Sequence, residues 1–317
     1  MDGNGRERRD IIVIGGSAGS LDAAKQIAAS LKPGLPAAVF VVIHGPPRQR
    51  NFLADVLNRV GPLPACQAVE SQAILPGRIY VPVPDRHLVL GQDHLHVTRG
   101  PKEGLQRPSI NVTFRSAARV YGRRVVGVLL SGMLDDGASG LWEIARHGGV
   151  TIVQDPQEAL FPSMPVSALR DVPVDYQLQA ATIGPLLSGL VLGEHVVENT
   201  AALRWHLDPE RFSGFTCPEC HGPLSEVQPK PPEFRCRVGH QFPLRTLISE
   251  HTSAQERKLY EAILALEEGA ELAEYAMEHG DGDEARREEL RKEAAQLRHH
   301  AASIRKFLEE RVVPPLD

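Results

Sequence analysis

The chain has no long apolar run and no strong excess of charge of either sign. Its apolar stretches, such as residues 37–43 and 125–130, are far shorter than the roughly 20 residues that a membrane-spanning helix needs. Only four apolar residues separate the polar N-terminus from the first glycines, too few for the apolar segment of a signal peptide. We therefore expect a protein that is not inserted in a membrane.

Cysteine is also scarce, and the net charge is small. Three of the 4 cysteines lie between residues 217 and 236, in a spacing typical of a metal site. This distribution argues against a disulfide framework and favours a reducing, cytoplasmic compartment. The net charge of -5 gives no general bias toward nucleic acid or anionic membranes, so we expect no nucleic-acid partner.

Residues 10–195 alternate apolar strands with amphipathic helices. Strands are predicted at 11–14, 37–43, 125–130 and 150–153, and helices at 51–60, 111–121 and 183–192. Short β-stretches between residues 79 and 97, around a turn at Gly91, predict an appended β-hairpin. The alternation with short loops predicts an α/β fold with a doubly wound, mostly parallel sheet.

Ser17 lies in the turn that ends the first predicted strand. The stretch from Gly15 to Gly19 fits G-x-S-x-G, in which a sharp turn exposes a nucleophilic serine. The same turn could instead bind a phosphate at a helix N-terminus, or Ser17 could cap the helix. The dinucleotide pattern G-x-G-x-x-G fails, because Ser17 stands where the second glycine belongs. The turn alone leaves the three interpretations open.

Two further loops carry polar side chains at the same edge of the predicted sheet. His44 follows the second strand, and the Asp135-Asp136 pair follows the third. Because the carboxyl ends of parallel strands meet at one edge, we expect Ser17, His44 and a carboxylate to converge. These are the nucleophile, base and orienting group of acyl-transfer hydrolysis. A loop hydrogen bond for His44 and helix capping for the aspartates are the alternatives.

Six separated motifs resemble the catalytic domain of the chemotaxis protein-glutamate methylesterase family, CheB. Their order and spacing over residues 9–195 make the resemblance specific. A typical member also carries an N-terminal receiver domain, and we expect this chain to be a stand-alone form without one. The motifs are IGGSAGS (14–20), Val42-Ile43-His44, PDRHL (84–88), RPSINVTFRSAA (107–118), LLSGMLDDGASGL (129–141) and QDPQEALFPSMPVSAL (154–169).

The resemblance implies a catalytic triad and an oxyanion site. The triad residues are Ser17, His44 and Asp136, and the oxyanion and supporting residues are Met133, through its backbone N–H, Ala18 and Gly132. Asp135 falls on a variable position of the family, so we expect a solvated or capping charge. The family usually has threonine where this chain has Ala18, so a hydroxyl beside the nucleophile is missing.

The function that the resemblance implies is removal of methyl esters from glutamyl residues of chemoreceptors, with deamidation of glutamines in some members. The reaction needs no catalytic cofactor, and the partner is the methylated cytoplasmic domain of a chemoreceptor. The main alternative is a weak or inactive scaffold in a two-component or chemotaxis-like pathway, which Ala18 favours. A third possibility is hydrolysis of a small ester or amide unrelated to receptors.

Residues 210–250 are predicted to form a small zinc-binding module. Cys217, Cys220, Cys236 and His240 follow the pattern C-x2-C-x15-C-x3-H, and three thiolates with one imidazole suit a closed structural zinc site. The Pro-rich stretch inside the motif indicates a loop-rich module, too poor in apolar residues to fold without a metal. Reduced cysteines in a small metal-free β-knuckle are the alternative.

Residues 254–312 carry two apolar stripes at helical spacing, separated by a polar break at 280–283. Equal stripes across a short break predict an antiparallel helical hairpin. Packing of the two helices on each other is the simpler expectation, and a docking surface for a second copy or another signalling protein is the alternative. The predicted organisation is a catalytic domain at 9–195, the module and the hairpin.

Overall fold

The computed structural model describes residues 9–45, 52–194, 211–280 and 283–310. The chain forms two compact units, residues 1–247 and 248–317. The first unit contains an α/β domain and a small antiparallel sheet, and the second contains a helical hairpin. The boundaries expected for the catalytic domain (9–195), the small module (210–250) and the hairpin (254–312) remain predictions.

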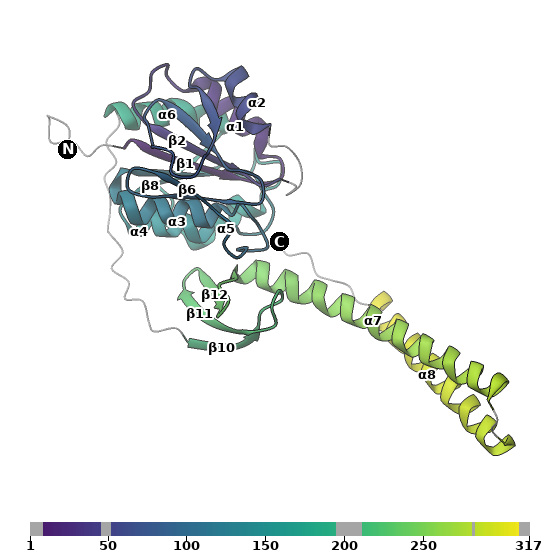
Figure 1. The fold of residues 1–317 in the computed structure, drawn as a ribbon. Helices are drawn as coiled ribbons and strands as arrows, with labels where there is room; N and C mark the ends of the chain where they lie inside the picture. The colour runs from purple at the N-terminus through teal and green to yellow at the C-terminus, as the bar shows by residue number, and fades with distance from the viewer. Residues whose placement is uncertain (1–8, 46–51, 195–210, 281–282, 311–317) are drawn as a thin grey trace. The chain divides into compact units, whose positions relative to one another are not determined.

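A seven-stranded parallel sheet is the centre of the first unit (Figure 1). The strand order is β3-β4-β2-β1-β7-β8-β9, and each neighbouring pair is parallel. The strands are β1 (Ile11–Gly16), β2 (Ala38–Ile43), β3 (Ala65–Gln67), β4 (Arg78–Val81), β7 (Val125–Leu129), β8 (Val150–Gln154) and β9 (Tyr176–Leu178). This topology confirms the predicted α/β fold.

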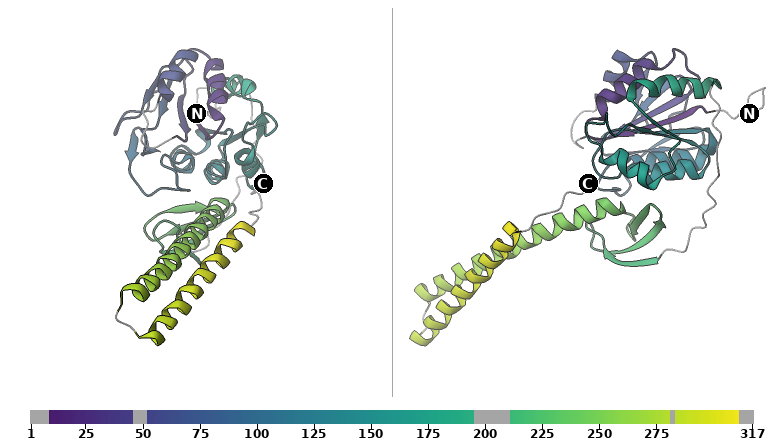
Figure 2. Two further views of the ribbon diagram at one scale, coloured as in Figure 1. Left: turned by 90° about the vertical axis from the view of Figure 1, so that its right-hand side faces the viewer. Right: turned by 180° about the vertical axis from the view of Figure 1, so that it is seen from behind.

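Helices cover both faces of the sheet (Figures 1 and 2). They are α1 (Ser20–Ser30), α2 (Leu53–Val60), α3 (Ile110–Tyr121), α4 (Ala138–Arg146), α5 (Ser163–Asp171) and α6 (Ala180–Leu192). Ile12 and Ile14 of β1 point into the core under α1, α2 and α6. Ile11 and Val13 point into the core under α3, α4 and α5. Burial on both faces explains why the central strands are continuous apolar runs.

The strand order creates a switch point between β1 and β7. From β1 the sheet grows in one direction through β2 and in the other through β7 and β8. Open α/β sheets bind ligands where loops diverge at such a carboxyl edge. Here the backbone N–H of Ser17 donates to the carbonyl of Ser131, with N···O 2.9 Å. This bond ties together the two loops that diverge at the switch point.

The segment between residues 78 and 98 is only partly a hairpin. β5 (His87–Leu90) and β6 (Leu95–Thr98) pair antiparallel, which confirms the predicted hairpin. The first of the β-stretches expected there lies instead in β4, which runs parallel to β2. The sequence does not predict β3 and β9, because a strand of three residues is too short to show a period.

Residues 211–243 form a four-stranded antiparallel sheet rather than the loop-rich module that we expected. Few apolar side chains are available, and they form one small core, which contains Leu224, Phe234, Phe242 and Leu247 together with Cys217 and Cys236. Strand residues between these positions are mostly proline or charged, which hides the alternation in the sequence. The strands are β10 (Arg211–Thr216), β11 (Pro223–Pro229), β12 (Pro232–Cys236) and β13 (Gln241–Pro243).

The second unit is an antiparallel helical hairpin, as predicted (Figure 2). It contains α8 (Glu284–Glu310) and most of α7 (Leu244–His279), whose first residues, up to Leu247, belong to the first unit; α7 thus begins before the predicted residue 254. Small side chains dominate the contact between them: Ala270, Ala273 and Ala294 are buried, and Leu290 and Leu297 are partly buried. The expected packing of each stripe on the other accounts for these contacts.

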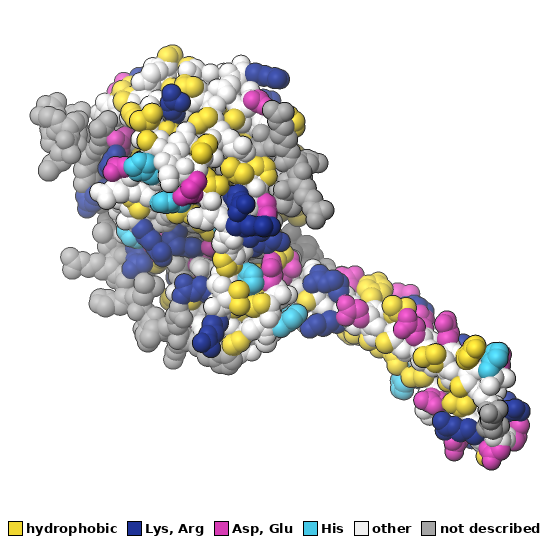
Figure 3. Space-filling view, viewed as in Figure 1, with side chains coloured by type: hydrophobic (Ala, Val, Ile, Leu, Met, Phe, Trp, Pro, Cys, Tyr) yellow, Lys and Arg dark blue, Asp and Glu magenta, His cyan; other side chains and the backbone are white. Residues whose placement is uncertain are grey.

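Acidic and basic side chains are interspersed on the surface of the hairpin (Figure 3). Arg305 of α8 pairs with Glu267 of α7 at 2.8 Å, and Arg298 pairs with Glu274. A docking role for the hairpin stays a prediction. No helix among the described residues combines the length and the apolar character that crossing a membrane requires.

Candidate active site

Ser17 lies on a tight turn between β1 and α1. Gly19 in this turn has φ 74°, a left-handed conformation that favours glycine. The Ser20 hydroxyl donates to the Ser17 carbonyl, with Oγ···O 2.7 Å, and fixes the turn. A Cβ on Gly132 would lie 2.9 Å from the Cβ of Ser17, so only glycine lets the neighbouring loop pass this close. The half-buried Ser17 is therefore held rigidly at the carboxyl edge of the sheet.

The imidazole of His44 lies between Ser17 and Asp136. Its Nδ1 is 3.2 Å from Ser17 Oγ, and its Nε2 is 2.8 Å from Asp136 Oδ2. An ionised carboxylate only accepts hydrogen bonds, so in neutral His44 the proton is on Nε2 and Nδ1 presents its lone pair to the serine. In the chymotrypsin-type triad the two ring nitrogens have the opposite roles. The His44 side chain is 10% exposed, which leaves little room for competing water.

The amino end of α3 holds the carboxylate of Asp136. The N–H groups of Ile110 and Asn111 donate to it at 2.8 and 3.1 Å, and the Ser109 hydroxyl donates at 3.0 Å. A helix N-terminus leaves such N–H groups unpaired, and the helix dipole favours a negative charge there. Burial acts to raise the pKa of Asp136, but the hydrogen bonds from His44 and α3 outweigh it and keep that pKa below its usual value. Asp136 is thus a fixed, ionised partner for His44.

The loop between β7 and α4 forms the other wall of the site. The Ser131 hydroxyl donates to the Ala18 carbonyl at 2.8 Å, and the Gly132 N–H donates to the Phe161 carbonyl at 2.9 Å. Among the described residues, the backbone N–H groups of Ala18 and Met133 have no protein acceptor. These two N–H groups are therefore available to a ligand, whereas that of Gly132 is already used.

Asp135 is buried, contrary to our prediction of a solvated or capping charge. It is only 5% exposed, and it accepts hydrogen bonds from Thr246 Oγ1 at 2.6 Å and from the Arg245 N–H at 3.1 Å. Burial raises the pKa of Asp135, although these two hydrogen bonds oppose the rise. The prediction is wrong because Thr246 lies 111 positions later in the chain, beyond the reach of any local pattern.

Sequence reasoning also misses the part that α3 plays in the site. A serine directly before a helical pattern signals an N-cap, and an open helix N-terminus suits an anion. Ser109 before Ile110 carries that signal, but nothing in the sequence says which anion it receives. Asn111 adds a second support, because its Oδ1 accepts from the N–H groups of Gly137 and Gly140 at 2.9 and 2.7 Å. The residue that follows Asp136 is thereby fixed as well.

Comparison with known proteins identifies the family. The family model described as CheB methylesterase matches residues 12–187, more than half of the chain. The chain belongs to the CheB methylesterase family. This result confirms the resemblance carried by the six sequence motifs, and Ser17, His44 and Asp136 all lie within the matched residues.

Individual CheB relatives agree with the family model. A Methanosarcina mazei protein named protein-glutamate methylesterase/protein-glutamine glutaminase 2 is 35% identical over 178 residues, 54% of this chain and 48% of that relative. A putative enzyme of the same name from Leptospira interrogans is 35% identical over 178 residues, 56% of this chain and 92% of that relative. The chain spans about half the length of several curated relatives that it matches.

A solved CheB structure matches the fold. The catalytic domain of CheB methylesterase from Thermotoga maritima is 30% identical, with a TM-score of 0.56. The match covers 58% of this chain and 100% of that domain. The likeness therefore accounts for the α/β domain and leaves the rest of the chain to be explained from its own residues.

A second site lies in the antiparallel sheet that follows the CheB domain. The ligand atoms of Cys217, Cys220, Cys236 and His240 all lie within 4.8 Å of one another. Cys220 Sγ is 3.5 Å from Cys236 Sγ, and His240 Nδ1 is 3.7 Å from Cys217 Sγ and 3.5 Å from Cys236 Sγ. The sequence thus correctly predicts that these four side chains converge.

Three of the six distances between these ligand atoms suit a tetrahedral zinc ion. Bond lengths of about 2.3 Å to sulfur and about 2.0 Å to nitrogen place tetrahedral ligand atoms roughly 3.5–3.8 Å from one another. The three distances above fall in that range. The Nε2 of His240 lies 3.6 Å from a carboxylate oxygen of Glu219, the kind of outer partner that orients a ligating imidazole.

Proposed function

We propose that the chain is a serine hydrolase that removes methyl esters from glutamyl residues of a chemoreceptor-like protein. The observation that carries this proposal is the hydrogen-bonded series from Ser17 through His44 to Asp136 at the carboxyl edge of a CheB-type sheet. The names of the relatives, protein-glutamate methylesterase/protein-glutamine glutaminase, supply the reaction class.

The proposed reaction proceeds through an acyl-enzyme. Nδ1 of His44 accepts the Ser17 proton while Oγ attacks the ester carbonyl, and Asp136 stabilises the imidazolium through Nε2–H. The N–H groups of Ala18 and Met133 stabilise the oxyanion. His44 then gives the proton to the departing methoxide, and methanol leaves. Water, deprotonated by the same nitrogen, releases the γ-glutamyl group as the free acid and restores Ser17.

The same groups suit hydrolysis of a glutamine side chain. An amide gives a tetrahedral intermediate with an amino group in place of the methoxy group, and His44 then protonates this leaving amine, so ammonia replaces methanol as the product and the acyl-enzyme is the same. No cofactor takes part in either reaction as proposed. The side chain of Ala18 takes no part in the proposed reaction, because only the backbone N–H of Ala18 contributes to the oxyanion site. A missing threonine hydroxyl therefore leaves the proposed oxyanion donors in place.

Exposed apolar side chains near the nucleophile favour a protein substrate. Leu160 is 73% exposed and Met133 is 58% exposed. A Cβ on Gly19 would lie 2.8 Å from the Cβ of Leu160, so Leu160 borders the turn that carries Ser17. An open apolar rim suits contact with a partner surface better than enclosure of a small ester. We propose that this rim contacts the methylated cytoplasmic region of the receptor.

We also propose that Cys217, Cys220, Cys236 and His240 hold a structural zinc ion. Four protein ligands complete a tetrahedron and leave no open position for chemistry, so the ion would stabilise the small sheet. All four cysteines of the chain are free thiols. Free thiols and thiolate ligands suit a reducing compartment, which supports a cytoplasmic location for the protein.

A fluorophosphonate probe tests whether Ser17 is an activated nucleophile. We expect one label per chain at Ser17, and loss of the label in Ser17→Ala, because the probe reacts only with a serine whose proton a base can take. Ser303→Ala is the control, since Ser303 is a serine of α8 whose hydroxyl bonds only within that helix, outside the stretch that matches the family. A folded wild-type protein that stays unlabelled would favour the scaffold alternative instead.

A further inference from the structure

The first turn of α7 is hydrogen-bonded to the loop between β7 and α4, which carries Asp136. Thr246 Oγ1 donates to Asp135 at 2.6 Å, and the Arg245 N–H donates to the same carboxylate at 3.1 Å. Asp135, Arg245 and Thr246 are all buried, at 5%, 8% and 2% exposure. The carboxylate immediately before Asp136 is therefore held by residues outside the stretch that matches the CheB family, which ends at residue 187.

The loop between β7 and α4 contains a strained backbone conformation. Leu134 has φ 64°, in the left-handed region that costs energy for a branched side chain. It lies between Met133, a proposed oxyanion donor, and Asp135. A conformation of this kind persists only where neighbouring contacts impose it. The backbone N–H of Leu134 donates to Ser163 Oγ at 2.9 Å, and the bonds on Asp135 hold the other side of the residue.

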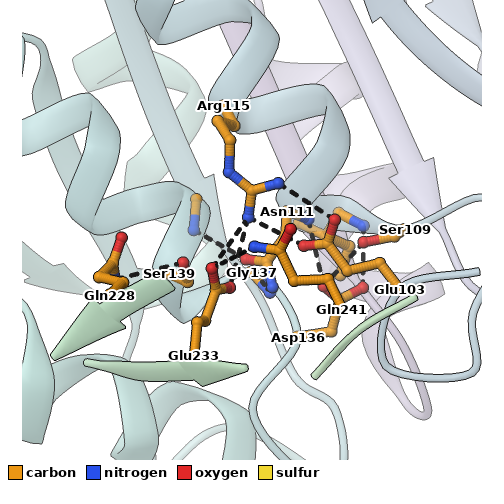
Figure 4. A network of polar contacts seen from close by, with 12 residues as sticks. Glu103, Ser109, Asn111, Arg115, Asp136, Gly137, Ser139, Gln228, Glu233 and Gln241 are labelled. Carbon is orange, nitrogen blue, oxygen red and sulfur yellow. Dashed lines mark hydrogen bonds and ion pairs between the residues drawn. The ribbon is translucent and has the colours of Figure 1, made fainter. Parts of the chain in front are cut away.

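Residues of the antiparallel sheet also contact the helix that holds Asp136 (Figure 4). Arg115, one turn after Asn111 in α3, bonds to Glu103 at 2.9 Å and to Glu233 of β12 at 3.3 Å. The amide of Gln241 in β13 donates to Glu233 as well. Arg115 and both carboxylates are largely buried, so these contacts are screened little by solvent. Both supports of Asp136, its loop and α3, are thus contacted from residues 211–247.

We propose that Thr246 is a positioning residue for the hydrolase reaction, acting through Asp135 on the loop that carries Met133 and Asp136. The inference rests on the proposed function of Ser17, His44 and Asp136. On this account the segment 211–247 completes the active site. If the hydrogen bond between Thr246 and Asp135 is lost, Asp136 and the Met133 N–H can move from their positions. A displacement of about 1 Å is enough to slow an enzyme reaction up to roughly 100-fold.

The test compares Thr246→Val with Thr246→Ser. Valine keeps the branched shape and removes the hydroxyl, whereas serine keeps the donor to Asp135. We expect Thr246→Val to lower kcat and the rate of Ser17 labelling by about 10-fold to 100-fold with KM nearly unchanged, and Thr246→Ser to stay within about 3-fold of wild type. Thr252→Val makes the same substitution later in α7 and should leave both rates unchanged. Should the valine variant not fold, Thr246→Ala replaces it.

A double-mutant cycle separates positioning from general damage. In an Asp135→Ala background, Thr246→Val should have no further effect on the labelling rate, because the bond it removes is already gone. A full additional loss, or wild-type rates in Thr246→Val alone, would overturn the inference. A wild type that is labelled at Ser17 but does not hydrolyse methylated receptor would contradict the proposed substrate. The labelling rates of the Thr246 variants relative to wild type would still test the positioning role of Thr246. A folded wild type that is not labelled at all would refute both the proposed hydrolase function and the positioning role of Thr246.

Discussion

Replacing Asp136 with asparagine is expected to lower kcat for methyl-ester hydrolysis by about 10,000-fold. The Ser109 hydroxyl and the Asn111 N–H donate to Oδ1, and the Ile110 N–H shares Oδ2 with His44 Nε2, so an amide oxygen at the Oδ1 position satisfies two of these three donors. The amide nitrogen is then left facing His44 Nε2, where it donates. The imidazole proton moves to Nδ1, and that nitrogen can no longer accept the proton of Ser17.

The measurement is steady-state kinetics on a methylated substrate, with folding checked by thermal unfolding. Asp22→Asn is a matched control, because Asp22 lies in the first turn of α1, close to Ser17 in sequence, with its side chain 82% exposed. We expect this control to keep wild-type kcat. Retention of more than roughly a tenth of wild-type kcat by a folded Asp136→Asn protein would contradict the assigned role.

Removing the proposed zinc ion is expected to unfold the antiparallel sheet of residues 211–243. We predict one zinc per chain in freshly purified protein, and loss of amide-exchange protection over residues 211–243 after chelation. The core of this sheet contains few apolar residues, and two of its buried side chains are the proposed ligands Cys217 and Cys236. Structural zinc contributes on the order of 10 kcal/mol in small modules, more than such a core can replace. If Thr246 positions the loop, chelation also lowers the labelling rate of Ser17.

Cysteine variants make this prediction specific. Cys236→Ser should reduce the zinc content to well below one per chain, because a hydroxyl is a poor substitute for a thiolate ligand. Cys66→Ser should leave the zinc content unchanged, since Cys66 lies outside the cluster. Substoichiometric zinc in the wild type, or a sheet that keeps its exchange protection in excess chelator, would count against the structural metal.

Strands that are continuous apolar runs could be predicted from the sequence, whereas strands of three residues could not. β1 and β2 are buried on both faces and read as continuous apolar runs, so they and the loops that follow them could be placed. β3 and β9 have only three residues each and take their structure from the edges of an existing sheet. The sheet of residues 211–243 depends on pairing between proline-rich and charged strands, which local preference does not reveal.

In the candidate site, too, residues placed by local sequence could be predicted, and contacts between distant segments could not. Ser17 and His44 could be placed because each lies in the loop that follows a predicted strand. Asp135 and Asp136 are neighbours with equal chemistry, and composition alone could not assign their different partners. Asp136 meets the amino end of α3, and Asp135 meets the start of α7, contacts that only the tertiary structure creates. The resemblance to the family distinguished the two aspartates but gave no role to Asp135.

Methanol release from membranes that carry methylated receptors tests the central claim most directly. Wild-type protein and its Ser17→Ala variant are compared at equal concentration, with folding of both verified. We predict release that depends on Ser17, with the variant at least about 1,000-fold slower than wild type. Equal release by the two proteins, or none by a wild type that is folded and loaded with zinc, would contradict the assignment of this chain as a receptor methylesterase.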